Sequence, residues 1–280
     1  RRNLDLLNKN DVYQFLKNNK PDYLIIAAAK VGGIHANSKY PVDFLLENIS
    51  IQTNLISGAF QNSISKLIFL GSSCIYPKYA EQPIKEDCLL SGKLEQTNEP
   101  YALAKIAGIK LCEAYNKQYK TDYRSLMPCN LYGPGDNYHP LNSHVIPGLI
   151  SRMHTAKLEK KSKFNVWGTG KPLREFLYVD DVAKATLHVM KIDDDEYQRK
   201  VISKTSHLNV GSGEEISINE LSHQIANIIG YKGDIVFDEN QPDGTPRKVL
   251  DISLIKSLGW APKINLIDGL KKTYTDFKKN

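Results

Sequence analysis

Short apolar runs and segments with helical spacing alternate along most of the chain. Apolar residues recur at helical spacing in 11–19, and 23–28 is a continuous apolar run of the kind expected for a parallel strand buried on both faces. A crossover helix is predicted at 49–62, followed by a second buried strand at 66–70. This alternation predicts an α/β fold built on a parallel sheet.

The same alternation continues through the rest of the chain. A helix is predicted at 101–119 and a strand at 123–127, and a later strand leads into a helix that starts near Asp180 and runs through Met190. Asp180 and Asp181 are expected to cap that helix rather than bind a metal. The remaining predicted elements are a loop-rich stretch at 133–174, a strand at 208–211 and helices at 217–229 and from 266.

Length and hydropathy limit the class of protein. With 280 residues, of which 41% are hydrophobic, the chain can bury a substantial core and form one large domain or two modest ones. Its apolar runs fall short of the ~20 residues that a membrane-spanning helix needs. Residues 1–5 lack the apolar core of a signal peptide. We therefore expect a compact cytoplasmic protein with no membrane segment.

Cysteine spacing and charge bear on the possible partners. The four cysteines show neither the paired spacing of metal ligands nor the density of a disulfide scaffold, so free thiols in a reducing compartment and no metal site are expected. The formal charge of +6 comes from scattered lysines, and the densest run, 157–163, contains Glu159 and lacks interleaved aromatic residues. No nucleic-acid partner is expected, whereas a modest positive balance suits anionic ligands such as dinucleotides.

The first candidate for chemistry is Tyr101 with Lys105, four places later in a sequence rich in alanine and leucine. That spacing places both side chains on one helix face, where an adjacent ammonium favours the phenolate and lowers the tyrosine pKa. Such a tyrosine can exchange a proton with a carbonyl or alcohol oxygen. A tyrosine and a lysine at this spacing also occur on many solvated helix faces, which is the alternative interpretation of the pair alone.

The run that precedes this helix strengthens the catalytic interpretation. The predicted strand at 66–70 ends in Gly71, Ser72 and Ser73, and loops at the carboxyl edge of a parallel sheet hold ligands. A hydroxyl at the end of a strand, with a Tyr/Lys pair on the next helix, resembles the Ser-Tyr-Lys arrangement of the short-chain dehydrogenase/reductase superfamily.

Motifs along nearly the whole chain narrow this resemblance. They are 27–34 (AAAKVGGI), 71–77 (GSSCIYP), 98–102 (NEPYA), 142–147 (NSHVIP) and 242–248 (PDGTPRK). The same motifs occur in this order in the GDP-L-fucose synthases, extended reductases that epimerise and reduce GDP-4-keto-6-deoxy-D-mannose. The chain is identified as a member of this family on these motifs.

The resemblance implies a Rossmann-type doubly wound parallel sheet with a smaller C-terminal α/β substrate lobe. The NADP-binding domain is expected at 1–133 and 172–211, and the nucleotide-sugar lobe at 134–171 and 212–280. The glycine-rich turn that normally opens such a fold is missing, and residues 1–7 resemble the segment after the second strand. We therefore expect the first βαβ portion to be missing from the numbered chain.

For catalysis, the resemblance implies two sets of residues. Cys74 and His144 exchange protons at the carbons that flank the sugar ketone, which inverts C3 and C5. Tyr101 then supplies a proton to the former carbonyl oxygen, Ser72 steadies that oxygen, and Lys105 assists the phenolate and holds the nicotinamide ribose. A small buried hydrophobe is the alternative interpretation of Cys74, and a hydrogen-bonded loop residue is that of His144.

NADP(H) is the implied cofactor and a GDP-4-keto sugar the implied substrate. Arg1 matches an arginine that binds the 2′-phosphate, although an exposed terminal charge is an equal alternative for it. The family pattern has threonine at the position of Cys129, so contacts there are expected from the backbone. The other residues implied at the cofactor are Leu70, Gly71, Ser72, Ser73, Lys105, Pro128, Asn130, Leu131 and His144. The residues implied at the substrate are Arg152, Trp167, Arg174 and Asp243, which offer paired donors, a flat apolar surface and a carboxylate.

Two other functions stay open. A C4-reductase of a related GDP-4-keto sugar, such as a GDP-heptose, would share the fold with little or no epimerisation, and motifs barely separate it from an epimerase/reductase. A non-catalytic NADP-binding scaffold is disfavoured by the intact set of predicted catalytic residues. The family also implies a homodimer joined through helices that flank the sheet.

Overall fold

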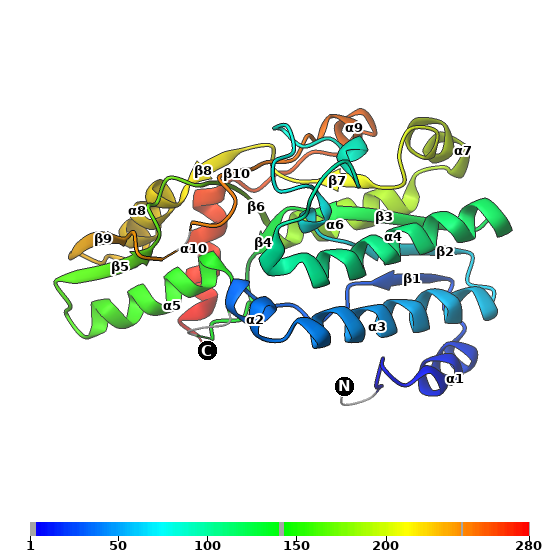
Figure 1. Cartoon of the computed structure of the whole chain (residues 1–280), viewed down its shortest axis with the longest axis horizontal. Helices are drawn as coiled ribbons and strands as arrows, with labels where there is room; N and C mark the ends of the chain where they lie inside the picture. The colour runs from blue at the N-terminus through cyan, green and yellow to red at the C-terminus, as the bar shows by residue number, and fades with distance from the viewer. Residues whose placement is uncertain (1–3, 140–142, 242, 280) are drawn as a thin grey trace.

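A parallel four-stranded sheet is the central element of the computed structural model, which describes residues 4–139, 143–241 and 243–279 (Figure 1). The strands follow the order β1–β2–β3–β7, and neighbouring strands pair in parallel. This confirms the predicted α/β fold with a parallel sheet. The strands are β1 (Tyr23–Ile26), β2 (Lys66–Leu70), β3 (Asp122–Pro128) and β7 (Leu208–Val210).

Helices connect the strands, and α3 and α4 lie side by side in front of them (Figure 1). The helix predicted at 49–62 begins at Pro41 instead, because proline is preorganised for the first helical position and Phe44 and Asn48 extend the buried face. The helices are α1 (Lys9–Asn19), α2 (Ile34–Lys39), α3 (Pro41–Gln61), α4 (Glu99–Tyr119), α6 (Val179–Lys191), α7 (Asp194–Tyr197) and α9 (Ser253–Ser257). Short 3₁₀ turns occur at Ser73–Ile75, Glu86–Cys88 and Gln96–Asn98, and a π-helical turn at Gln198–Ile202.

The start of α6 differs from the prediction that Asp180 and Asp181 cap it. Tyr178 is the N-cap residue, and no side chain caps that end. The Asp181 carboxylate instead accepts hydrogen bonds from the backbone N–H groups of Lys263 and Ile264, at 2.9 and 2.8 Å. The capping prediction is wrong because Asp181 fixes a loop far away in the sequence rather than its own helix end.

The rest of the described chain forms two small sheets with helices packed against them. β6 is the central strand of the first, since it pairs in parallel with β4 and β10 and antiparallel with β8. β5 and β9 form the second. The strands are β4 (Asn130–Tyr132), β5 (Lys163–Trp167), β6 (Leu173–Tyr178), β8 (Glu215–Ser217), β9 (Asp234–Asp238) and β10 (Arg247–Lys248), and the helices are α5 (Val145–Leu158), α8 (Ile218–Ile229) and α10 (Leu266–Phe277).

The stretch 133–174 is less rich in loops than predicted, because α5 and β5 lie within it. Ile146, Leu149, Ile150 and Met153 recur at helical spacing and are all buried. That spacing was the available signal for α5.

Buried apolar side chains form two clusters. The first surrounds the four-stranded sheet, with Phe69 and Ile109 among its members, and the second lies around α5, α8 and β6, with Ile150 and Ile225. Leu250 joins the first cluster, although it falls in the part of the chain predicted to form the substrate lobe. The predicted lobe boundaries stay a prediction, because a buried cluster does not define where a lobe begins in the sequence.

Two features are not found among the described residues. None of their helices is long and apolar enough to cross a membrane. They also contain no group of three or more His, Cys, Asp or Glu side chains that could hold a metal ion. Arg1, predicted to bind the cofactor, and the motif residues Asn142 and Pro242 lie outside the described residues.

Candidate active site

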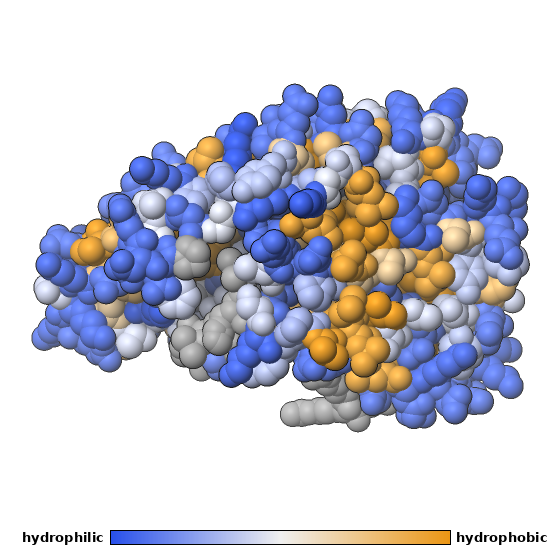
Figure 2. Space-filling model, viewed as in Figure 1, coloured by the Kyte–Doolittle hydropathy of each residue, from blue (hydrophilic) through white to orange (hydrophobic). Residues whose placement is uncertain are grey.

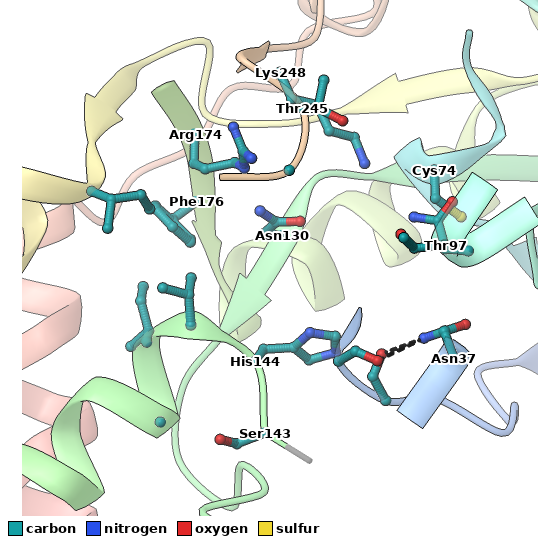
Figure 3. Close-up of a pocket in the computed structure, with 18 of the residues that line it drawn as sticks. Asn37, Cys74, Thr97, Asn130, Ser143, His144, Arg174, Phe176, Thr245 and Lys248 are labelled. Atoms are coloured by element: carbon teal, nitrogen blue, oxygen red, sulfur yellow. Dashed lines mark hydrogen bonds between the residues drawn. The ribbon is translucent and has the colours of Figure 1, made fainter. Parts of the chain in front are cut away.

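Side chains from the two parts of the molecule meet around one cavity of about 380 Å³ (Figure 3). The turn after β2, together with β4, β6, β10, α4 and α5, contributes residues to its lining. The predicted site residues that line it are Ser72, Cys74, Tyr101, Asn130, Leu131, His144, Arg152, Trp167 and Arg174. Residues far apart in the sequence, from Gly32 to Lys248, are thus brought to one place.

Ser72 and Cys74 reach the cavity from the 3₁₀ turn Ser73–Ile75, which follows β2 directly. The Gly71 N–H donates to Leu126 O at 2.8 Å, which keeps the start of the turn against β3. A Cβ at Gly71 would collide with a β3 side chain, so this close approach requires glycine. The Ser72 hydroxyl accepts a hydrogen bond from the Cys74 N–H at 3.4 Å, which ties the Ser72 side chain to the backbone of the turn.

Cys74 and His144 enter the cavity from different elements, the turn after β2 and the N-cap of α5 (Figure 3). Burial raises the pKa of the Cys74 thiol, and the charge of Lys248 offsets part of that effect. Burial lowers the pKa of the His144 imidazole, which the charge of Asp136 partly offsets. Both groups are therefore uncharged near neutral pH, so one can remove a proton from a carbon between them while the other returns one.

Tyr101 and Lys105 lie four residues apart on α4. Lys105 Nζ donates to Leu70 O at 2.8 Å and lies 5.8 Å from the centre of the Tyr101 ring. Burial lowers the pKa of Lys105 to about 8. The expected lowering of the Tyr101 pKa is wrong: burial raises it, and a hydrogen bond with Ser72 offsets only part of the increase. Enclosure by protein disfavours the phenolate, so Tyr101 rests as a proton donor.

Three cations line the cavity: Arg152 of α5, Arg174 of β6 and Lys248 of β10. Lys248 and Arg174 are paired residues of parallel strands and so lie side by side. Both guanidinium groups donate to backbone carbonyl oxygens at 2.8–3.5 Å, and neither forms a salt bridge with any residue that the structure describes. Burial lowers the pKa of both arginines. Half-buried cations that form no salt bridge with the described residues favour an anionic ligand.

Trp167 provides a flat apolar surface at the cavity, with 52% of its area exposed. The Arg152 guanidinium carbon lies 5.4 Å from the centre of its ring. Val166 and Phe176 add buried apolar lining next to it. This end of the cavity can therefore hold a planar ring beside a charged group.

Other predicted site residues do not line the cavity. The Asp243 carboxylate accepts hydrogen bonds from Thr169 N at 2.7 Å and from Thr169 Oγ1 at 2.8 Å, so it holds the turn after β5. Cys129 is buried, and burial raises its pKa well above the ordinary value. The further predicted residues outside the lining are Leu70, Gly71, Ser73, Lys105 and Pro128. Their roles at a ligand stay predictions.

Several polar residues at the cavity were missed from the sequence. Lys248 ends the motif 242–248, Asn98 opens the motif 98–102, and Asn37 follows shortly after the motif 27–34. Their place in or near these motifs was the available signal. The side-chain oxygens of Asn37 and Asn98 are buried and have no hydrogen-bond partner in the described part of the chain, while Asn37 Nδ2 donates to the backbone oxygens of the preceding glycine pair.

Comparison of the sequence with known proteins gives consistent matches. The family model described as "NAD dependent epimerase/dehydratase family" matches residues 1–211. The GDP-L-fucose synthase of Escherichia coli is 53% identical over 277 residues, which cover 99% of this chain and 86% of that protein. The GDP-L-colitose synthase of Yersinia pseudotuberculosis is 42% identical over 271 residues, 96% of this chain and 85% of that protein.

Solved structures also resemble this one over its whole length. A GDP-6-OMe-4-keto-L-xylo-heptose reductase from C. jejuni has a TM-score of 0.94 and 37% sequence identity, covering 100% of this chain and 88% of that one. A GDP-L-fucose synthetase from Naegleria fowleri bound to NADP has a TM-score of 0.88 and 27% identity, covering 100% of this chain and 84% of that one.

Proposed function

Because the chain belongs to the NAD dependent epimerase/dehydratase family and, within it, to the GDP-L-fucose synthases, we propose that it converts GDP-4-keto-6-deoxy-D-mannose to GDP-L-fucose with NADPH. The observation that carries this proposal is that two pairs of reactive side chains, one suited to each half of the reaction, line the same cavity. Cys74 and His144 suit epimerisation, and Ser72 with Tyr101 suits reduction. A protein that had lost catalysis would have no need to keep both.

The residues around the end of β2 fit the nicotinamide end of NADP(H). Lys105 is a buried ammonium beside Tyr101, and Gly32 and Gly33 line the cavity. We assign Lys105 to the nicotinamide ribose, with backbone of the Gly71 turn close to the ring. Bound NADPH supplies the hydride that reduces C4.

Epimerisation comes first in the proposed sequence. The 4-ketone acidifies the hydrogens on C3 and C5, so a base can remove one and an acid can return it from the opposite face. Cys74 and His144 provide these two roles, since both line the cavity, are uncharged near neutral pH and can exchange protons there. Lys248 stabilises a thiolate formed at Cys74 and lies at the same cavity.

Reduction follows at C4, where negative charge collects on the former carbonyl oxygen. Tyr101 donates a proton to this oxygen, and its raised pKa keeps that proton available at neutral pH. The Ser72 hydroxyl donates a hydrogen bond to the same oxygen. Arg152 and Arg174 hold the diphosphate, because guanidinium groups offer paired donors to its oxygens. Trp167 lies against the base, because its indole ring is flat, apolar and half exposed at the cavity.

One incubation tests the proposed function. The protein is mixed with NADPH and GDP-4-keto-6-deoxy-D-mannose in D₂O, and the product is identified by NMR. GDP-L-fucose with deuterium at C3 and C5 is the expected product. Cys74→Ser is expected to suppress the deuterium incorporation and to release a 4-reduced sugar that is not epimerised. An unlabelled product from the unaltered protein would exclude the epimerase step.

A second candidate is a C4-reductase of a GDP-4-keto-heptose. The fit of the whole chain to the C. jejuni heptose reductase, with its TM-score of 0.94, favours it. The 53% identity to the Escherichia coli fucose synthase, against 37% to that reductase, favours the deoxyhexose. A panel of GDP-4-keto sugars separates the two, because a heptose reductase turns over the heptose fastest and leaves C3 and C5 unlabelled.

We also propose that the protein works as a homodimer through α3 and α4. Apolar side chains gather on the surface over these helices (Figure 2), including Val42, Leu46 and Ile49 of α3 and Leu103 of α4, which are 36–68% exposed. Leu46→Glu is expected to shift the sedimentation coefficient from dimer to monomer. Leu158→Glu, at an equally exposed leucine on α5, is the matched control and should leave the dimer intact.

The cytoplasm is the proposed location. All four cysteines are free thiols, which fits a reducing compartment. No nucleic-acid partner is proposed, because the positive charge is scattered and the described cations of the cavity are placed for a small anion. Salt-sensitive binding of mixed oligonucleotides would contradict this.

A further inference from the structure

A chain of hydrogen bonds between fully buried groups lies directly behind the turn that carries Cys74. The Tyr76 hydroxyl oxygen is 2.7 Å from His207 Nε2 and 2.5 Å from Asn209 Oδ1. Tyr76 is 3% exposed, and His207 and Asn209 are 0% exposed. Because water cannot compete with bonds at this depth, they hold their geometry more firmly than surface bonds do.

The direction of each hydrogen bond follows from Asn209. Its amide nitrogen donates to Ile84 O at 2.9 Å and to Asp251 O at 3.1 Å, which identifies the other amide atom as the acceptor oxygen. The Tyr76 hydroxyl therefore donates its one proton to Asn209 Oδ1. Its oxygen is left to accept from His207 Nε2–H, so the imidazole is the tautomer protonated at Nε2.

The far end of the chain is also satisfied. His207 Nδ1 is 3.2 Å from Ser206 Oγ and accepts a hydrogen bond from that hydroxyl. Burial lowers the pKa of His207 to about 3 and raises that of Tyr76 well above its ordinary value. Neither group ionises near neutral pH, so the chain keeps one arrangement throughout the working range.

This chain ties the turn to two distant segments. Asn209 belongs to β7, and its N–H donates to Glu86 Oε1 at 3.0 Å. The Ile84 N–H donates to Val249 O at 2.8 Å, immediately after the cavity residue Lys248. The end of the turn at Tyr76, the segment 84–86 and the segment after Lys248 are therefore held as one unit.

Tyr101 and Lys105, which are assigned to the reduction step, are supported by other contacts. Lys105 donates to Leu70 O at 2.8 Å, and Gln52 of α3 donates to Ala104 O at 2.6 Å, so α4 is fixed from two sides. Ser72 follows Gly71, whose N–H is bonded to β3. Cys74, by contrast, lies between this anchor and Tyr76, and it depends on both.

We propose that Tyr76 is a positioning residue for Cys74: its bonds to His207 and Asn209 hold the far end of the turn, so that the thiol faces the substrate carbon, while Tyr101 and Lys105 on α4 are supported independently. This inference rests on the proposed function and deepens it, because it gives the epimerising thiol and the proton donor for reduction separate structural supports. Tyr76 itself does not line the cavity of about 380 Å³ described above, so it is proposed to affect Cys74 only by holding the turn.

The test compares Tyr76→Phe with the unaltered protein in D₂O, NADPH and GDP-4-keto-6-deoxy-D-mannose. The measured quantity is deuterium incorporated at C3 and C5 per NADPH oxidised. We expect this ratio to fall about tenfold or more, as a small misplacement of a reacting group can do, with the unepimerised 4-reduced sugar as the accumulating product. The dissociation constant of NADPH should change little, because two of its predicted contacts, Lys105 and Gly71, are fixed by Leu70 O and by β3 rather than by Tyr76.

Tyr123→Phe is the matched control. Tyr123 is also buried in the first cluster and donates a single hydrogen bond, to Ile64 O at 3.2 Å, but it lies at the opposite end of the sheet. If both variants keep the unaltered ratio, Tyr76 does not position Cys74 and the inference is overturned. If the unaltered protein reduces the substrate without incorporating deuterium, the proposed function fails first, and this inference with it.

Ser206→Ala keeps the test valid if Tyr76→Phe does not fold. It removes only the hydroxyl that donates to His207 Nδ1, at the outer end of the chain. We expect a smaller fall in the same ratio, of about two- to fivefold, because the bond lost is worth about 0.5–1 kcal/mol. A normal ratio in a folded Ser206→Ala protein and a changed melting temperature alone would show that the chain is only structural.

Discussion

Arginines lie near both ends of the central sheet, but their hydrogen-bonding differs. Arg124 at the amino end is buried, whereas Arg152 and Arg174 near the carboxyl end are half-buried. At the amino end, all five N–H donors of the Arg124 guanidinium are used. They donate to Asp122 at 2.6 and 2.9 Å, to Asp194 at 2.7 Å, and to the backbone oxygens of Val189 and Ile192 at 2.6 and 3.0 Å. A charge satisfied in this way has no capacity left for a ligand.

At the carboxyl end, the cations lack carboxylate partners. Arg152 and Arg174 bond only to backbone oxygens among the described residues, and burial lowers the pKa of both. Lys248 lies beside Arg174 and faces the same cavity. The comparison teaches that burial alone does not identify a functional charge; the unused hydrogen-bonding capacity of the buried charge does.

The largest expected effect is on the chemistry at the carboxyl end. Tyr101→Phe removes the proton that C4 reduction needs, so kcat for NADPH oxidation should fall by about a thousandfold, equivalent to about 4 kcal/mol in the barrier. The melting temperature should change little, because the phenol makes few structural bonds. Stopped-flow NADPH absorbance measures the rate, and NADPH oxidation at the normal rate would remove Tyr101 from the mechanism.

The next effect is on stability at the amino end. Arg124→Met removes one of the two cations that Asp122 and Asp194 share and leaves them only Lys66 among the described residues. Because all five donors of a buried guanidinium are lost with it, the free energy of unfolding should fall by about 3 kcal/mol. Urea unfolding followed by circular dichroism measures it. KM for the sugar nucleotide should not change in the folded protein, and a raised KM would mean that the two ends of the sheet are not separate in function.

Arg174→Met tests the opposite case at the carboxyl end. We expect KM for the GDP-sugar to rise about tenfold, since a hydrogen bond to a charged group contributes about 1.5–3 kcal/mol. The free energy of unfolding should stay within about 1 kcal/mol, because no described carboxylate loses a partner. A stability loss as large as that of Arg124→Met would contradict the distinction between the two ends.

The smallest expected effect is a difference in how the stability contributed by two lysines, Lys105 and Lys66, depends on pH. Burial lowers the pKa of Lys105 to about 8, below its unfolded value, so the unfolded chain binds more protons above this pH and stability from Lys105 rises with pH. Burial also disfavours the charged form of Lys66, but hydrogen bonds to Asp194 and Asp122 outweigh it and raise the pKa. The stability from Lys66 is therefore present below its unfolded pKa and is lost as pH rises through the folded value.

Melting temperatures from about pH 7 to about pH 12 check these signs, because the effect of Lys66 falls above its unfolded pKa of about 10.4. Lys105→Met should flatten a rise in stability above about pH 8, and Lys66→Met should flatten a fall at higher pH. Activity should also decline above about pH 8 as Lys105 loses its charge. Identical profiles of melting temperature against pH for both variants would show that burial and hydrogen bonding affect the two lysines in the same way.

Prediction from the sequence was strongest where a feature depends on near neighbours. The spacing of Tyr101 and Lys105 gave a shared helix face, and the apolar run at 66–70 gave the strand that leads to Ser72; the structure contains both elements. The extent of the helix that begins at Pro41 was missed, although Val42, Phe44 and Leu45 already supply apolar residues to its first turns. The roles of the site residues at a bound ligand stay predictions.

Features that depend on distant neighbours were not predictable in this way. Nothing in the local sequence of Asp181 indicates that it accepts bonds from residues 263 and 264. Lys248 was not singled out, because its importance comes from lying next to Arg174 and near Cys74 in the folded chain. Sequence resemblance identified Arg174 as a substrate residue, but the sequence gave no physical reason why Arg174 and not Arg124 should be free to bind a ligand.

The sequence by itself determined the alternation of strands and helices, the parallel sheet and the turn that presents a serine and a thiol after β2, because these follow from periodicity and from residues close together in the chain. Only the tertiary structure decided which buried charges are satisfied, that Tyr101 rests as a phenol, and that Tyr76 is bonded to His207 and Asn209. The reason is that desolvation and hydrogen-bond partnership are set by whichever side chains surround a group in space, and most of those come from distant parts of the sequence.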